Sequence, residues 1–294
     1  MLNMQKKAVI ITGATCSGKS AYAVDYAKKH NGIIINADSM QVYKTFPVLS
    51  AQPSFDDLKN IEHRMYSFLN YNQNYSVKQW LEDVSFNIYN VLESRKLPVI
   101  VGGTGMYINA LLNGISAIPN VPSNIMQGLS DLLISQGVEF LYNKLLSIDP
   151  EYASSIKKND KQRIIRALAV FEATGKSITH FWQNNYKYCS DVVFEVFLKT
   201  LPREDLYSKI DNRVLQMFEC GAIDEVEKFS NLLQNDDLQY GNNIKTIGVN
   251  EILMYLKHEI SLDDAIKKTQ QLTRNYAKRQ CTWFNNQLDN PKMI

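Results

Sequence analysis

The sequence predicts an α/β fold in which a parallel sheet forms the core and helices form both an insertion and the C-terminal segment. Three observations support this class. A glycine-rich motif, G-x-x-x-x-G-K-[ST], occupies residues 13–20 directly after an apolar run. Further short apolar runs alternate with helical patterns, which is typical of parallel sheets. Between residues 119 and 186 the pattern is helical without a strand-like run, which indicates an insertion.

The first strand and the motif after it predict a phosphate-binding loop in a P-loop NTPase-like core. Residues 8–12 have the apolar pattern of a strand buried on both faces, and the chain continues as a helix to Lys29. The glycines allow successive backbone N–H groups to point at phosphate oxygens, Lys19 adds a positive charge, and Ser20 offers a hydroxyl to Mg²⁺. This context disfavours a glycine turn without a ligand. The expected diphosphate or triphosphate site comprises Gly13, Ala14, Thr15, Cys16, Ser17, Gly18, Lys19 and Ser20.

Two more predicted strands end on polar residues. The apolar run at residues 33–37 ends on Asp38, and the run at 98–101 ends on a glycine-rich segment that contains Thr104. Ligands of parallel α/β sheets bind beyond the carboxyl ends of the strands. We therefore expect the phosphate loop, Asp38 and Thr104 to face one crevice.

The remaining elements follow from capping residues and periodicity. Ser76 and Gln79 have the spacing of a capping box and are predicted to open a helix that ends at Glu93. An apolar run at residues 192–198 is predicted to return the chain to the sheet, and Ser261 to open a last helix. These boundaries predict a core of residues 1–118 and 187–294 and a helical insertion of residues 119–186.

Composition restricts the location and the partners of the chain. Its 294 residues are 45% apolar with a net charge of +2, so a polyanion would have to bind a local basic patch. The four cysteines are scattered without a metal-binding pattern, so reduced thiols are expected. The N-terminus has no signal-peptide pattern and no apolar run long enough to cross a membrane. We expect a cytoplasmic protein without a membrane partner and, because no heptad run occurs, a monomer.

Two segments carry a basic excess. Residues 157–166 contain five basic residues and one acidic residue, and the chain from residue 265 to the end contains six basic residues and one acidic residue. Arg163 and Arg166 are three apart, so they share a helical face, and Gln162 lies near Arg166. Contact with nucleic-acid phosphates and a pair of solvated helix faces are equally good interpretations of these segments.

Asp38 is a candidate general base. A phosphate loop followed one strand later by an isolated carboxylate provides a site for a phosphorylated donor and a base for an acceptor. The alternative is that Asp38 caps the N-terminus of a helix.

A set of motifs in chain order resembles the tRNA dimethylallyltransferase family, also known as tRNA isopentenyltransferases. Besides the phosphate loop, the motifs are A-D-S-M-Q-V-Y at 37–43, Y-S-V at 75–77, P-V-I-V-G-G-T-G-M-Y at 98–107, N-D-K-Q-R-I-I-R-A-L at 159–168, T-G-K-S at 174–177, R-V-L-Q-M at 213–217 and T-R-N-Y-A-K-R-Q-C-T-W-F at 273–284. The resemblance implies transfer of the five-carbon group of dimethylallyl diphosphate to N6 of the adenine on the 3′ side of the anticodon. It also implies tRNAs that read codons beginning with U.

The resemblance also implies roles for individual residues. Lys19 and Arg213 would meet the diphosphate, Ser20 would lie near Mg²⁺, Asp38 would take a proton from the amine, and Thr104 would lie where the adenine meets the donor. The anticodon stem-loop of tRNA would be contacted by Asp38, Ser39, Met40, Gln41, Thr104, Met126, Gln162, Arg163, Ile164, Ile165, Arg166, Lys245, Thr246, Ile247, Gly248, Val249 and Asn250.

The sequence departs from the family pattern in three places. Residues 48–53 replace a segment that often carries a lysine, Val249 stands where a tyrosine is usual, and Cys16 replaces a usual alanine. Two other functions fit the phosphate loop. The first is a small-molecule or nucleotide kinase, against which the basic insertion argues. The second is an RNA-binding ATPase switch, for which the sequence shows no apolar run ending in a second metal-binding acid.

Overall fold

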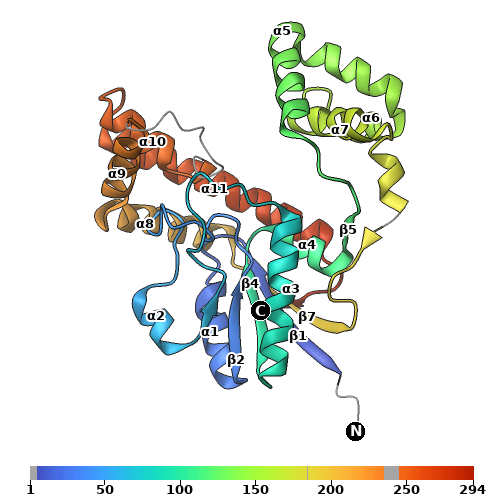
Figure 1. The fold of residues 1–294 in the computed structure, drawn as a ribbon. Coiled ribbons are helices and arrows are strands. Elements are labelled where there is room, and N and C mark those ends of the chain that lie inside the picture. The colour runs from blue at the N-terminus through green and yellow to red at the C-terminus, as the bar shows by residue number, and fades with distance from the viewer. Residues whose placement is uncertain (1–4, 184, 235–244) are drawn as a thin grey trace. The chain divides into compact units, whose positions relative to one another are not determined.

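The computed structural model describes residues 5–183, 185–234 and 245–294 and divides into two compact units. The first unit, residues 1–112 and 188–294, contains a six-stranded parallel sheet of order β3-β2-β4-β1-β7-β8 (Figure 1). Its strands are β1 (Lys6–Gly13), β2 (Gly32–Asn36), β3 (His63–Arg64), β4 (Leu97–Gly102), β7 (Val192–Lys199) and β8 (Lys292–Met293). The apolar runs that the sequence predicts as strands form the centre of this sheet.

The register of β1 sets the position of the phosphate loop. Ile11 pairs with Val101 of β4 on one side and with Phe197 of β7 on the other. The loop therefore leaves the sheet between the carboxyl ends of β4 and β7. Thr12 fixes this edge further, because its hydroxyl donates to the carbonyl of Gly102 at 2.8 Å.

Helices surround the sheet of the first unit. They are α1 (Lys19–Lys29), α2 (Phe55–Asn60), α3 (Val77–Glu93), α4 (Gly105–Asn113), α8 (Arg203–Glu219), α9 (Ala222–Gln234), α10 (Val249–Leu256) and α11 (Leu262–Gln287). The predicted capping box of α3 is confirmed, with Ser76 as N-cap and Gln79 closing the box, and Ser261 caps α11 as predicted. Figure 1 shows α11 passing over one end of the strands. No described helix has the length and apolar character needed to cross a membrane.

The second unit, residues 113–187, has its own hydrophobic core. It contains β5 (Ile115–Ser116), α5 (Ser123–Ile148), α6 (Pro150–Ser155), α7 (Lys161–Thr174), the 3₁₀ helix η1 (Thr179–Gln183) and β6 (Asn185–Tyr186). The unit begins at Asn113 rather than Pro119, because β5 and β6 pair as a two-residue antiparallel ladder at its base. Strands this short leave no hydrophobic pattern in the sequence. The expectation that residues 119–186 contain no strand is thus corrected at β6.

Candidate functional site

The phosphate loop begins at the carboxyl end of β1, where the backbone requires glycine. Gly13 has a φ of 153°, and a Cβ there would overlap the carbonyl of Lys199 on β7. The loop then turns, with the N–H of Ser17 donating to the carbonyl of Ala14 at 3.2 Å. The first turn of α1 follows directly, so its free N–H groups face the end of the loop.

Lys19 lies at the start of α1 and is partly buried. Its ammonium donates to the Ala14 carbonyl at 3.3 Å. Burial lowers the pKa of Lys19, the negative charge of Asp38 opposes that shift, and the positive charge of Arg213 adds to it. The loop thus places a cation within electrostatic reach of both Asp38 and Arg213.

Arg213 projects from α8 toward the phosphate loop. Its Nη2 donates to the hydroxyl of Thr15 at 2.5 Å, and its buried Nε has no hydrogen-bond partner among the described residues. A buried donor without a partner is destabilising until a ligand accepts from it. Arg213 and Lys209 also line an open cavity of about 470 Å³ at the mouth of the loop, together with Cys16, Gly18, Lys19 and Ser20. This cluster of donors suits an anion.

Asp38 follows β2 in a turn that its neighbours fix. Its backbone N–H donates to Asn36 Oδ1 at 2.9 Å, and Asn36 Nδ2 donates to the Asp38 carbonyl at 3.0 Å. The Asp38 carboxylate accepts from the N–H of Met40 at 2.9 Å. The helix-cap alternative is wrong, because residues 39–54 form turns and loops.

Thr104 lies beside Asp38, at the end of the neighbouring strand. Its hydroxyl accepts from the N–H of Ser39 at 2.9 Å and donates to the Ser39 hydroxyl at 3.3 Å. The ends of β2 and β4 therefore meet at Ser39, but Thr104 itself is not among the residues that line the cavity between Asp38 and the phosphate loop. Ser39 is the residue that links the two candidate catalytic groups.

One cavity of about 310 Å³ joins Asp38 to the phosphate loop. Its walls include Thr15, Asp38, Ser39, Met40, Arg213, Met217, Lys245, Thr246, Ile247, Tyr276 and Arg279. Burial, together with the negative charge of Asp38, raises the pKa of Tyr276 above its usual range, and the same two causes raise the pKa of Tyr66. Asp38 is thus the acidic residue in the lining of a cavity that Arg213 also lines.

The other predicted tRNA contacts of the first unit divide between this cavity and the core. Lys245, Thr246 and Ile247 line the cavity. Gly248 is the N-cap of α10, Val249 is fully buried in a cluster of apolar side chains, and Asn250 is exposed. The Gln41 amide donates to the carbonyls of Ser50 and Ala51. The side chain of Val249 therefore packs in the core and is not among those that line the cavity.

The predicted contacts in the second unit lie on α5 and α7. Gln162 and Arg163 are exposed and Arg166 is half-buried, whereas Ile164 and Ile165 are buried in the core of the unit. Arg163 forms an ion pair with Asp160 at 3.4 Å. Met126 is partly buried against the same core. Gln162 and Arg163 are thus the exposed residues among these five, and Arg166 is only partly accessible.

Sequence reasoning assigned no role to Gln280, although the residue lies in one of the quoted motifs. Its side-chain oxygen accepts from the N–H of Thr15 at 2.8 Å, and its amide donates to the carbonyl of Gly103 at 2.8 Å. A Cβ on Gly103 would overlap this amide. Tyr276 and Arg279 were missed in the same way. The spacing of four residues between Tyr276 and Gln280, which places both on one helical face, was the available signal for Tyr276.

Few side chains in the described part of the chain could bind a metal ion. Among the described residues, no three His, Cys, Asp or Glu side chains lie close enough to hold a metal ion. The exposed hydroxyl of Ser20 at the loop is the group that fits Mg²⁺, which takes most of its ligands from substrate phosphates and water. All four cysteines are free.

Comparisons with known proteins find the same protein family over nearly the whole length of this chain. The family model described as IPP transferase matches residues 41–287, and the one described as isopentenyl transferase matches residues 6–72. A Wolbachia pipientis protein named tRNA dimethylallyltransferase is 43% identical, over 99% of this chain and 96% of its own. A Rhizobium etli protein of the same name is 40% identical, over 97% of this chain and 95% of its own.

Two solved structures have the same fold. The tRNA isopentenylpyrophosphate transferase of Bacillus halodurans has a TM-score of 0.68 at 32% identity, covering 98% of this chain and 89% of its own. A eukaryotic dimethylallyltransferase acting on tRNA has a TM-score of 0.79 at 28% identity, covering 95% of this chain and 70% of its own.

Proposed function

This chain belongs to the IPP transferase family of tRNA dimethylallyltransferases, and we propose how its residues carry out the transfer. The dimethylallyl group of dimethylallyl diphosphate moves to N6 of the adenine on the 3′ side of the anticodon, in tRNAs that read codons beginning with U, and diphosphate is released. The observation that supports this assignment of roles is the single cavity lined by Asp38, Thr15 and Arg213. This cavity contains both a base, Asp38, and a site for an anion at Thr15 and Arg213.

The anion end of the cavity binds the leaving diphosphate. Lys19, Arg213 and the N–H groups of the loop supply positive charge, and the unpartnered Nε of Arg213 gains an acceptor. Stabilising the leaving group favours cleavage of the C1–O bond, whose electron pair departs with diphosphate, because the allyl cation that develops is resonance-stabilised. Mg²⁺, held by the Ser20 hydroxyl and diphosphate oxygens, would neutralise further negative charge there.

The other end of the cavity handles the acceptor. As N6 of adenine forms its bond to C1, the nitrogen becomes positively charged, and Asp38 takes one of its protons. Thr104 holds Ser39 and hence the turn that presents the Asp38 carboxylate. The adenine has to leave the stacked anticodon loop to reach this carboxylate.

Binding of the anticodon stem-loop depends on basic residues of both units. Arg163 and Arg166 on α7, and Lys245 and Arg279 in the first unit, supply charge for the phosphates. A chain with a net charge of only +2 can bind RNA in this way, since local patches rather than net charge determine the contact. Because tRNA is the acceptor, the proposal places the reaction in the cytoplasm, with the chain acting as a monomer.

The experiment that tests the proposal supplies Mg²⁺, unmodified tRNA and labelled dimethylallyl diphosphate to the purified chain, with ATP in a parallel reaction. Label on the adenine beside the anticodon, without a need for ATP, is the expected result. The Asp38→Asn variant should label that adenine at least about a hundredfold more slowly while still binding tRNA. Label at another nucleotide, or turnover of ATP with no label, would refute the proposed reaction.

A further inference from the structure

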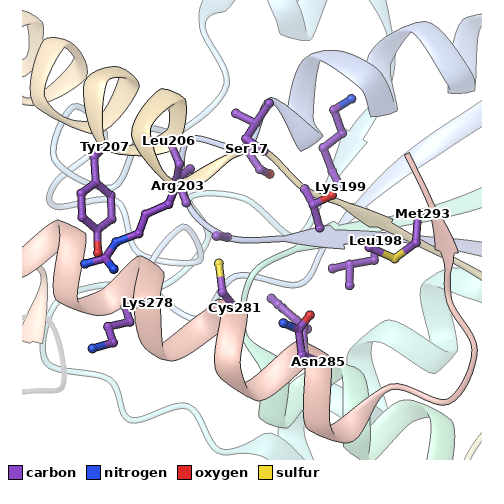
Figure 2. A pocket seen from close by; sticks show the side chains of 14 residues that line it. Ser17, Leu198, Lys199, Arg203, Leu206, Tyr207, Lys278, Cys281, Asn285 and Met293 are labelled. Atoms are coloured by element: carbon purple, nitrogen blue, oxygen red, sulfur yellow. The ribbon is translucent and has the colours of Figure 1, made fainter.

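A second cavity lies against the phosphate loop, separate from the reaction cavity (Figure 2). It encloses about 390 Å³, a volume in the range of small-molecule sites. The phosphate loop, the end of β7, the first turns of α8, the later turns of α11 and β8 form its walls. Ala14 and Ser17 line this cavity, whereas Thr15 and Arg213 line the reaction cavity. The phosphate loop is thus a wall that the two cavities share.

Positive charge gathers at one side of this cavity. Arg203, Lys199 and Lys278 line it, and no aspartate or glutamate does. Across residues 5–183, 185–234 and 245–294, none of these three cations forms an ion pair. Figure 2 shows the charged ends of Arg203 and Lys278 on the same side of the cavity, while the amine of Lys199 points away from it. Cations without a counter-charge beside low-dielectric walls attract an anion.

The rest of the lining is apolar. Leu198, Leu206 and Phe284 are at most 4% exposed, and their side chains form walls of the cavity. Met293 adds a thioether from β8. An inorganic anion would leave these walls unfilled, so the lining suits an anion that carries an apolar group.

Ser17 supplies a polar group without a partner. The residue is 2% exposed, and its hydroxyl has no hydrogen-bond partner in the part of the chain that the structure describes. Figure 2 shows this hydroxyl pointing from the loop toward the other lining side chains. Buried hydroxyls bond to a protein group, a water or a ligand in nearly all proteins, so the Ser17 hydroxyl is available to bond to a group that enters the cavity.

We propose that this second cavity binds an organic phosphate ester. The phosphate group lies against Arg203 and Lys278, the apolar group lies against Leu198 and Phe284, and the Ser17 hydroxyl bonds to an oxygen of the ester. An isoprenoid phosphate and a nucleoside phosphate share this chemistry. The proposal does not depend on the transfer reaction, because Arg203, Lys278, Leu198 and Phe284 have no role in it. Only the phosphate loop, through Ala14 and Ser17, is shared with the donor site.

Calorimetric titration of the full chain tests the proposal. Saturating inorganic diphosphate and Mg²⁺ keep the reaction cavity occupied, and the probes are geranyl monophosphate, adenosine monophosphate and inorganic phosphate. At least one ester should bind with a stoichiometry of one and at least tenfold more tightly than inorganic phosphate. The ester that binds identifies the source. If neither ester binds more tightly than phosphate, the proposal is wrong.

Three variants place the bound ester in this cavity. Arg203→Gln should weaken its binding at least tenfold, whereas Arg95→Gln, an exposed arginine on the loop before β4, should not change it. Ser17→Ala should also weaken binding without lowering the melting temperature of the free protein, since no bond is lost. Cys281→Phe fills part of the cavity and should exclude the ester, with the melting curve reporting that the variant is folded. An ester that binds these variants as tightly as the original chain does not occupy this cavity, and that result overturns the proposal.

Discussion

The amide of Gln280 connects the phosphate loop to the strand end that carries Thr104. Its oxygen accepts from the N–H of Thr15 and its nitrogen donates to the carbonyl of Gly103, both at 2.8 Å. The N–H of Thr15 is therefore already bonded and does not belong to the donors available for diphosphate. Gln280 is 6% exposed, and its two bonds tie the phosphate loop to the end of β4, so we expect it to position the loop relative to Thr104.

Two replacements of Gln280 test its hydrogen bonds to Thr15 and to Gly103 separately. Gln280→Leu leaves a buried N–H and a buried carbonyl without partners. If the resulting loss of about 1–3 kcal/mol is felt in the transition state, kcat should fall roughly 5- to 150-fold. Gln280→Glu can still accept from Thr15 but donates to Gly103 only when its carboxyl is protonated, so its kcat should rise as the pH is lowered. Thr282→Ala, an exposed change on the same helix, is the control. Steady-state kinetics across pH provide the measurement, and a pH-independent kcat in Gln280→Glu would contradict the positioning role.

Asp38 should be needed for chemistry and not for its local fold. Asp38→Asn keeps an oxygen that can accept from the N–H of Met40, so the turn should persist while the base is lost. General-base catalysis contributes about 10²–10⁴ in rate, and kcat should fall by that factor. The dissociation constant for tRNA, measured by filter binding, should change by less than about threefold, because the loss is of one acceptor contact at most. Full turnover in this variant would remove Asp38 from the mechanism.

Diphosphate should stabilise the chain through Arg213. The buried Nε of Arg213 gains an acceptor when an anion enters, and a ligand at a hundred times its dissociation constant adds about 2.7 kcal/mol to the free energy of unfolding. Thermal melts with and without diphosphate measure this shift. Arg213→Ala should abolish most of the shift and raise the KM for the donor. An equal shift in the variant would show that the anion binds elsewhere.

Local signals explain why much of the site could be predicted from the sequence. The loop motif specifies its own backbone, and parallel strands bring their carboxyl ends to one edge, so Asp38 and Thr104 follow from two apolar runs. Gln280 is different, because its partners Thr15 and Gly103 are 265 and 177 residues away along the chain. Only the packing of α11 against the sheet brings the three together.

The same distinction applies to the fold. Two residues, Ser76 and Gln79, determine where α3 begins, and the sequence predicted this start correctly. The boundary at Asn113 depends on a ladder of two-residue strands, β5 and β6, that has no periodicity to detect. The burial of Val249 depends on α10 packing against α9, which no single segment encodes.

The basic face of α7 should contribute to tRNA binding through salt-dependent contacts. Arg163 is 63% exposed at its side chain, and its ion pair with Asp160 is open to solvent, so the arginine can exchange that partner for a phosphate. Replacing Arg163 and Arg166 by alanine should lower the slope of log affinity against log salt by roughly 0.7 per lost contact. Lys144→Ala, which breaks an ion pair with Glu172 in the same unit, is the control. An unchanged slope would mean that this face of α7 is exposed to solvent and does not contact tRNA.

Asp149 should make the stability of the second unit depend on pH at the acid end. Burial acts to raise its pKa, but hydrogen bonds from Thr179 and from the N–H of Tyr152 outweigh burial, so the pKa lies below the usual value of 3.8. A carboxyl whose folded pKa is depressed stabilises the fold fully above its unfolded pKa, and the contribution is lost as the pH falls toward the folded pKa. Asp149→Asn should therefore lower stability by a constant amount from pH 5 to pH 8, by about 1–3 kcal/mol, and the deficit should shrink below pH 4. Hydrogen exchange of residues 113–187 in the full chain measures this deficit, with the exposed Glu139→Gln as the matched control. A deficit that stays constant down to pH 2 would mean that the Asp149 carboxylate is not stabilised by these bonds.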